Sequence, residues 1–151
     1  MREKVTARGF LNIKLIDRKT GKVIEERRHE NDLLGDFAIG VCGELAGQAN
    51  VLLGKLDYVD LYTPDAAFIK SLSPPETLEY LEYADHKEVH AVWKDKSTDS
   101  YTVGTVYMWS KYTINSTEYT RTIAVKDGLN VSKGADQVLV VDWTIAVYHA
   151  T

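Results

Sequence analysis

The end of the chain carries the clearest alternation of apolar and polar residues. Between Gln137 and Val147, apolar side chains recur at every second position: Leu139, Val141, Trp143, Ile145 and Val147. A period of two places them on one face of a β-strand, with Asp142 and Thr144 on the other. So much apolar surface needs a neighbouring strand and a second layer. We therefore expect a C-terminal strand within the core, with these side chains buried: Leu139, Val141, Trp143 and Ile145.

Similar alternation predicts strands along much of the chain. Residues 9–16 and 22–29 predict two strands, and the polar loop between them, which ends at Gly21, is typical of a β-hairpin. Further strands are expected at 55–63 and from residue 87 almost to the end, with turns at 94–99, 127–128 and 133–134. Within 101–109, the alternation predicts that Trp109 is buried.

One segment has the spacing of a helix, at about 32–46. Asn31 or Asp32 is the expected N-cap and Gly47 the expected stop at the C-terminal end. The apolar stripe consists of Leu33, Leu34, Phe37, Ala38, Val41 and Leu45. Glycines inside the helix weaken it by roughly 1 kcal/mol each relative to alanine, but they also permit close packing: Gly35, Gly40 and Gly43.

The middle of the chain, 64–85, is expected to be rich in loops because Pro64, Pro74 and Pro75 interrupt it. Its segment 77–83 fits either a strand or a helical turn. Many strands with short turns and a single helix indicate a mainly β fold, an antiparallel sandwich or barrel with one short helix packed on it. A length of 151 residues fits one domain, 1–151.

Composition and charge exclude several classes of function. The net charge is −4 without a long basic run, so we expect no nucleic-acid partner. No apolar run approaches the roughly 18 residues of a membrane span, and the charged start, Met1 to Val5, does not resemble a signal peptide. The single cysteine, Cys42, excludes an internal disulfide, and its apolar neighbours predict a buried, inert thiol.

Candidate chemistry is sparse. The chain contains no nucleophile, phosphate-loop or dinucleotide motif, so we expect a protein that is not an enzyme and that has no catalytic residues, cofactor or small-molecule substrate. The strongest metal candidate is the trio His86, Glu88 and His90. On a helix the two histidines would share a face, but on the expected strand they lie roughly 13 Å apart, so no metal site is predicted.

Aromatic residues leave two interpretations open. The chain has three tryptophans and nine tyrosines, and an exposed platform of such rings on a sandwich would suit the stacking of sugar rings. Burial in the core and in subunit contacts is the interpretation that we favour, because strands often place aromatic residues there.

Three segments resemble those of small β-sandwich structural proteins of tailed phages and related prokaryotic viruses. Residues 9–24, with an Asp-x-x-Thr-Gly turn at 17–21, resemble their N-terminal hairpin. Residues 31–47, which end in Leu-Ala-Gly, resemble the helix that follows it. Residues 119–145, which end in Leu-x-Val-x-Trp-x-Ile, resemble their closing hairpin. The order and spacing of the segments agree over about half of the chain.

The resemblance implies a non-enzymatic structural protein of the virion, present in the host cytoplasm during assembly. It would be a tail, decoration, turret or capsid-associated component and would bind copies of itself and other virion proteins. The alternative is a β-sandwich module that binds carbohydrate or a host surface. A monomer that left the apolar residues of 64–85 in solvent would expose a large patch. The residues expected at a subunit interface are Leu78, Tyr80, Leu81 and Tyr83.

Overall fold

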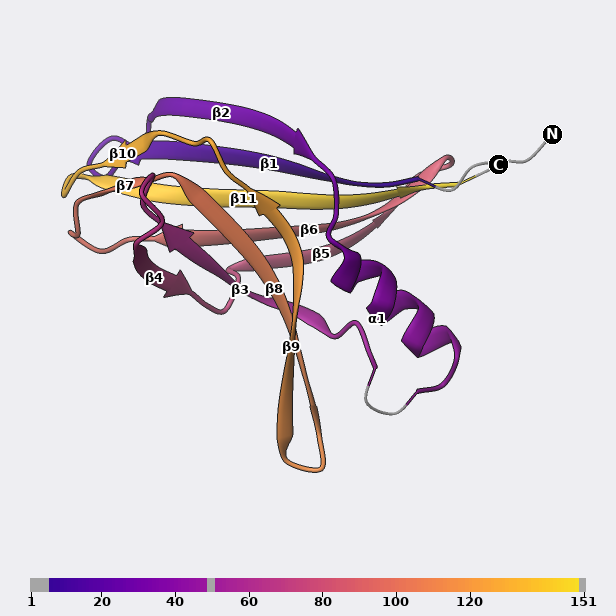
Figure 1. The fold of residues 1–151 in the computed structure, drawn as a ribbon. Helices are drawn as coiled ribbons and strands as arrows, with labels where there is room; N and C mark the ends of the chain where they lie inside the picture. Colours follow the sequence, from indigo (N-terminus) through magenta and orange to yellow (C-terminus); the bar gives the residue numbers. More distant parts are fainter. Residues whose placement is uncertain (1–5, 49–50, 150–151) are drawn as a thin grey trace.

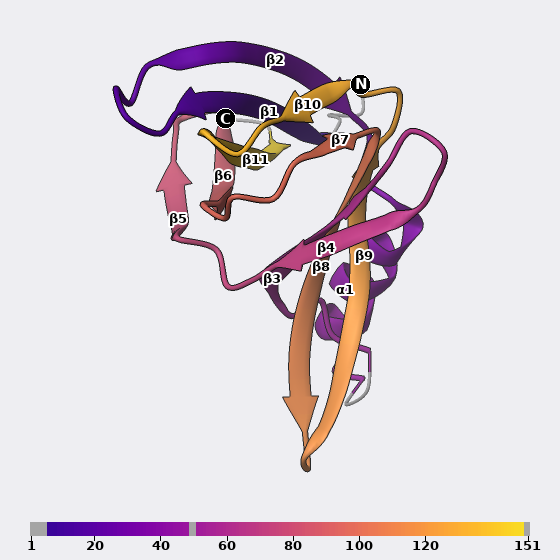
Figure 2. The ribbon, with the colours of Figure 1, turned by 90° about the vertical axis from the view of Figure 1, so that its left-hand side faces the viewer.

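Two antiparallel β-sheets pack face to face, and a helix lies at their side (Figure 1, Figure 2). The structure is a computed structural model that describes residues 6–48 and 51–149. The first sheet has the strand order β2-β1-β11-β6-β5 and the second β4-β3-β8-β9, and a short pair, β10-β7, lies beside them. The predicted mainly β fold with one short helix is confirmed, and it is a sandwich.

The first sheet is built from β1 (Thr6–Asp17), β2 (Val23–Asn31), β5 (Thr77–Glu82), β6 (His86–Asp95) and β11 (Gln137–Tyr148). The second is built from β3 (Lys55–Tyr62), β4 (Phe68–Leu72), β8 (Thr105–Ile114) and β9 (Thr117–Lys126). The remaining elements are α1 (Gly35–Leu45), β7 (Tyr101–Val103) and β10 (Val131–Lys133). The β8–β9 hairpin projects beyond the first sheet (Figure 1).

The C-terminal strand lies in the middle of the first sheet, between β1 and β6. The four side chains expected in the core are buried there: Leu139, Val141 and Trp143 are 0% exposed and Ile145 is 6% exposed. Trp143 also donates its indole N–H to Asn31 Oδ1 (3.3 Å), so its polar atom is satisfied. The prediction from alternation is confirmed for this strand.

The prediction that Trp109 is buried is wrong. The expected strand 101–109 is interrupted at Gly104, whose N–H donates to the carbonyl of Tyr62 (2.7 Å). This interruption shifts the alternation by one position, so Val106 and Met108 of β8 point into the core. Trp109 therefore lies on the outer face of the second sheet and is only partly buried.

The helix ends where the sequence predicts, but it begins with a different N-cap. The N-cap is Leu34, which makes no side-chain cap, so capping by Asn31 or Asp32 is wrong. The C-terminal end is as expected: Gly47 has φ 69°, and the N–H of Gln48 donates to the carbonyl of Gly43 (2.9 Å). This is a Schellman stop, in which the residue with positive φ is usually glycine.

The fully buried residues of α1 are glycines, whereas Leu33 and Phe37 of the predicted apolar stripe are partly buried against the core. Gly40 and Gly43 are buried, and a Cβ on Gly43 would lie 2.0 Å from the carbonyl oxygen of Val51. The helix therefore packs backbone to backbone on the segment just before β3. Leu45 is 84% exposed and Ala38 is also exposed, so the predicted stripe is wrong at these two positions. Cys42 is exposed, and the prediction of a buried thiol is also wrong.

The middle segment, 64–85, contains more regular structure than expected, because β4 and β5 both lie in it. Residues 77–82 form a strand, which decides between the two interpretations of that segment. Among the described residues, no helix is long and apolar enough to span a membrane. The charged start at Met1 to Val5 lies outside the described residues.

We predict that Trp143→Ala lowers the free energy of unfolding by about 3–5 kcal/mol, because it leaves a large cavity at the centre of the core. Thermal and denaturant unfolding measure the change. Ile24→Ala is the matched control, since Ile24 is 53% exposed on β2, and it should change the stability by less than about 0.5 kcal/mol. An unchanged unfolding midpoint for Trp143→Ala would contradict the central role of this side chain.

Candidate functional site

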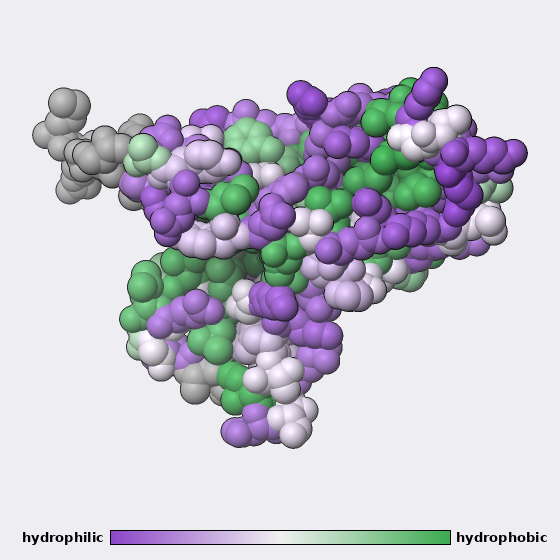
Figure 3. Space-filling view, turned by 180° about the vertical axis from the view of Figure 1, so that it is seen from behind, coloured by the Kyte–Doolittle hydropathy of each residue, from purple (hydrophilic) through white to green (hydrophobic). Residues whose placement is uncertain are grey.

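An apolar cleft of about 500 Å³ opens between the end of the first sheet and the helix (Figure 3). From the first sheet it is lined mainly by Leu78, Tyr80, Val89, Ile145 and Val147. From the opposite side it is lined by Phe37 of α1, Leu53, Leu56 and Ile123 of β9. Its volume lies within the roughly 300–1,000 Å³ of typical small-molecule sites, and its lining is mostly apolar.

The cleft exists because α1 is attached to the second sheet. The N–H of Leu34 donates to the carbonyl of Ile123 (2.9 Å), and Asp36 Oδ2 accepts from the N–H of Thr122 (3.2 Å). Glu44 Oε1 accepts from the N–H of Leu53 (2.8 Å). The helix, residues 51–53 and β9 thus form one unit. The apolar end of the first sheet faces this unit across the cleft and remains uncovered.

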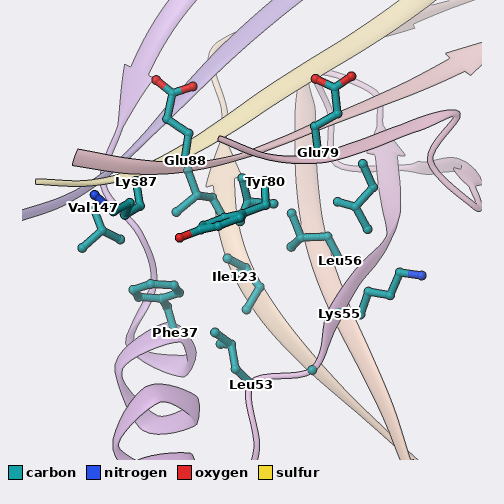
Figure 4. A pocket seen from close by; sticks show the side chains of 14 residues that line it. Phe37, Leu53, Lys55, Leu56, Glu79, Tyr80, Lys87, Glu88, Ile123 and Val147 are labelled. Carbon is teal, nitrogen blue, oxygen red and sulfur yellow. The ribbon is translucent and has the colours of Figure 1, made fainter. Parts of the chain in front are cut away.

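Tyr80 lies over this cleft, and it is 63% exposed (Figure 4). Its hydroxyl donates to Glu82 Oε1 (2.8 Å), and this hydrogen bond raises the pKa of Tyr80. The carboxylates of Glu79 and Glu88 point away from the cleft (Figure 4). The interior therefore presents apolar groups and the two aromatic rings of Phe37 and Tyr80, which suits the binding of apolar side chains.

The structure divides the four predicted interface residues. Leu78 and Tyr80 line the cleft. Leu81 points to the other face of β5, because the side chains of a strand alternate. Tyr83, 46% exposed, stacks on His86 with ring centroids 4.6 Å apart. Sequence reasoning missed the opposite wall of the cleft. It placed Phe37 only in the helical stripe and assigned no role to Leu53 and Ile123.

Strand β5 is also an edge strand, because within the described chain it pairs only with β6. An unpaired edge offers main-chain hydrogen bonds to another strand. The other edge of this sheet, β2, carries a dense set of charged residues, which discourages such pairing: Glu25, Glu26, Arg27, Arg28 and Glu30. The more apolar edge of the sheet is therefore the one beside the cleft.

The metal candidates lie on β6, which is a strand as predicted. His86 contacts Asp85 (Nδ1 to Oδ1, 2.7 Å) and Glu88 (Nε2 to Oε1, 2.9 Å), and these carboxylates raise the pKa of His86. His90 Nε2 instead lies 2.6 Å from Asp142 Oδ1. Each histidine thus has its own carboxylate partner, and no group of metal-ligating side chains is found among residues 6–48 and 51–149.

A buried charged network lies where β6 runs into the 96–100 turn. Asp95, 4% exposed, accepts hydrogen bonds from Tyr101 Oη (2.5 Å) and the N–H of Ser97 (2.9 Å), and Lys70 Nζ lies 3.1 Å away. Burial alone would raise the pKa of Asp95, but these hydrogen bonds outweigh it and hold the pKa well below the ordinary value.

Lysine 133 completes this network. Lys133 is 2% exposed and donates to the carbonyls of Ser97 (2.8 Å), Asp99 (2.6 Å) and Gly134 (3.2 Å). Burial lowers the pKa of Lys133. Because all of these groups have partners within the chain, we interpret the network as a structural tie between the turn and β10.

Aromatic side chains gather on the outer face of the second sheet, and we call them the aromatic row: Tyr58, Tyr62, Phe68, Tyr107 and Trp109. Tyr58 and Trp109 stack with centroids 5.7 Å apart. Tyr62 meets Tyr107 (5.4 Å) and Phe68 (5.5 Å) edge to face. Sequence reasoning placed Trp109 in the core, so it did not connect these rings.

Comparison with known proteins gives no relative of this chain. No family model matches it, and neither a curated protein nor a solved structure matches it.

We predict that Asp95 contributes stability that depends on pH. Its folded pKa is lower than its unfolded pKa, so the contribution is present above about pH 4 and is lost as the pH falls toward the folded pKa. Asp95→Asn should lower the free energy of unfolding at pH 7 by about 2–4 kcal/mol and flatten its acid dependence. Denaturant unfolding at pH 7 and at about pH 3 measures both effects. Equal acid dependence in the variant and the wild type would contradict this role.

We also predict that His86, Glu88 and His90 hold no metal, because each histidine already faces a different carboxylate. Elemental analysis of protein purified without chelator should find no stoichiometric zinc, and chelator should leave the Tm unchanged. Zinc at one equivalent that disappears in His86→Ala would refute the prediction.

Proposed function

We propose that this protein is a non-enzymatic structural subunit of a virion that assembles with copies of itself through the apolar cleft and strand β5. The observation that carries this proposal is that Tyr80, which is 63% exposed, lies over an apolar cleft beside the open edge of strand β5. Apolar surface of this kind is usually covered by a partner, and tyrosine is enriched at such contacts.

A second copy is the occupant that we favour, because the chain itself displays exposed apolar groups on α1, the helix that lines the cleft through Phe37. Ile39 and Leu45 of α1 are 50% and 84% exposed. The edge of β5 adds main-chain groups that pair with another strand. In such a contact the apolar side chains supply the buried area, and the pairing of strand edges fixes the register between the two copies.

We propose the virion class because three segments resemble those of phage structural proteins, and the arrangement of these segments supports the proposal. Residues 9–24 contribute to β1 and β2, 31–47 contain α1, and 119–145 contain most of β9 to β11. In space β1 pairs with β11, and α1 packs on β9. The similar segments therefore contact one another in the fold, whereas β5 comes from the part of the chain that shows no resemblance. We place the protein among tail, decoration, turret or capsid-associated components, with other virion proteins as further partners.

We predict that Tyr80→Ala with Tyr83→Ala lowers the mass of the assembly, because both rings lie at the β5 edge. Light scattering coupled to size exclusion, at micromolar concentration, measures the mass of wild type and variant. The matched control is Val23→Ala with Ile24→Ala, which removes exposed apolar groups, 50% and 53% exposed, from the opposite edge strand.

The control should assemble as the wild type does, and circular dichroism should show that every variant is folded. A wild type that is monomeric in solution and in particles would contradict the proposal. A double variant that keeps the wild-type mass would show that β5 is not the assembly surface.

A further inference from the structure

We propose that the aromatic row on the outer face of the second sheet binds an uncharged oligosaccharide. A sugar ring has an apolar face of C–H groups and a rim of hydroxyls. The negative faces of aromatic rings attract the C–H groups, and the rim requires hydrogen-bonding partners. The row combines ring faces with phenol hydroxyls, so it meets both requirements. This inference does not depend on the assembly proposal.

The row borders a hollow of about 230 Å³, lined by Tyr62, Ala66, Thr105, Tyr107 and Trp109. This volume is below the roughly 300–1,000 Å³ of sites that enclose a small molecule. The hollow therefore suits one sugar ring laid on the surface, with further units of the oligosaccharide along the row. Thr105 places a hydroxyl at this position beside the aromatic rings.

The rings are held in place before any ligand arrives. Trp109 stacks on Tyr58 with planes inclined by only 8°, and Tyr62 is fixed between Tyr107 and Phe68 by edge contacts. All of these residues lie on paired strands of one sheet. A preorganised surface loses little side-chain entropy on binding, which favours recognition of a weakly binding ligand such as a sugar.

The charge around the row favours a neutral ligand. Asp60 lies on β3 between Tyr58 and Tyr62 and accepts a hydrogen bond from Ser71. Burial raises the pKa of Tyr58, and the negative charges of Asp60, Asp57 and Glu118 raise it further. Lys111, two positions beyond Trp109, is paired with Asp57 (3.4 Å) and Glu118 (3.8 Å). Anionic ligands, such as phosphates or sialylated sugars, therefore meet net repulsion here.

Tryptophan fluorescence tests the proposal directly, because Trp93 and Trp143 are 0% exposed and Trp109 lies at the surface. The full chain is titrated with cellotetraose, chitotetraose, maltotetraose and mannotetraose, and with 3′-sialyllactose as the anionic comparison. We expect at least one neutral oligosaccharide to change the emission saturably, and the anionic sugar to bind more weakly. Isothermal titration calorimetry confirms the affinity without relying on the fluorophore.

The variants Tyr107→Ala and Tyr62→Ala should each weaken the affinity about tenfold or more, which corresponds to about 1.4 kcal/mol for the loss of a stacking ring. The conservative changes Tyr107→Phe and Tyr62→Phe keep the ring and separate stacking from the phenol hydroxyl. Ile24→Ala removes an exposed apolar side chain (53% exposed) from β2, in the other sheet, and should leave the sugar affinity unchanged. Thermal unfolding checks that each variant is folded.

Absence of binding by all four neutral oligosaccharides at millimolar concentration would overturn the proposal. So would an affinity that is unchanged in both alanine variants, because the sugar would then bind elsewhere. If Tyr107→Ala changes the mass of the assembly and no sugar binds, the row is a protein contact and the proposal is wrong. Loss of assembly in the β5 variants with intact sugar binding separates the two proposals.

Discussion

The pairing of β11 with both β1 and β6 is the interaction on which the structure depends. The strand is hydrogen-bonded from Gln137 to Tyr148 on its β1 side and over most of that length on its β6 side. Its inward side chains, with Trp143 at the centre, form the apolar face on which the second sheet packs. Because β1 and β11 come from opposite parts of the sequence, the first sheet forms only when much of the chain has been synthesised.

The second sheet covers this apolar face incompletely, because α1 is held against the second sheet. Gly40 and Gly43 let the helix backbone approach 51–53 closely, and hydrogen bonds attach it to β9. The helix is thus held against the second sheet and does not close over the end of the first. Close packing in one place therefore creates the apolar cleft in another.

The inner and outer faces of the second sheet present different chemistry. Ile123 belongs to the cleft, which is apolar and lies beside an open strand edge. Trp109 belongs to the outer face, where rings alternate with hydroxyls and a carboxylate. In the functions that we propose, the first surface joins subunits and the second recognises a sugar. A subunit with this arrangement keeps its recognition surface free when it assembles.

The amino-acid sequence by itself determined the features that depend on local periodicity and turn chemistry. The buried face of β11, the hairpin turn at Gly21 and the helix stop at Gly47 follow from alternation and from glycine at positive φ, which neighbouring residues specify. The tertiary structure alone decided the side on which Trp109 lies, since a break at Gly104 shifts the alternation and depends on the chain beside Tyr62. It also decided that α1 buries glycines, that Cys42 is exposed, and that Leu78 and Tyr80 line one cleft with Phe37 and Ile123. Such a cleft brings together residues far apart in the sequence, and periodicity specifies which face a side chain occupies but not what lies opposite.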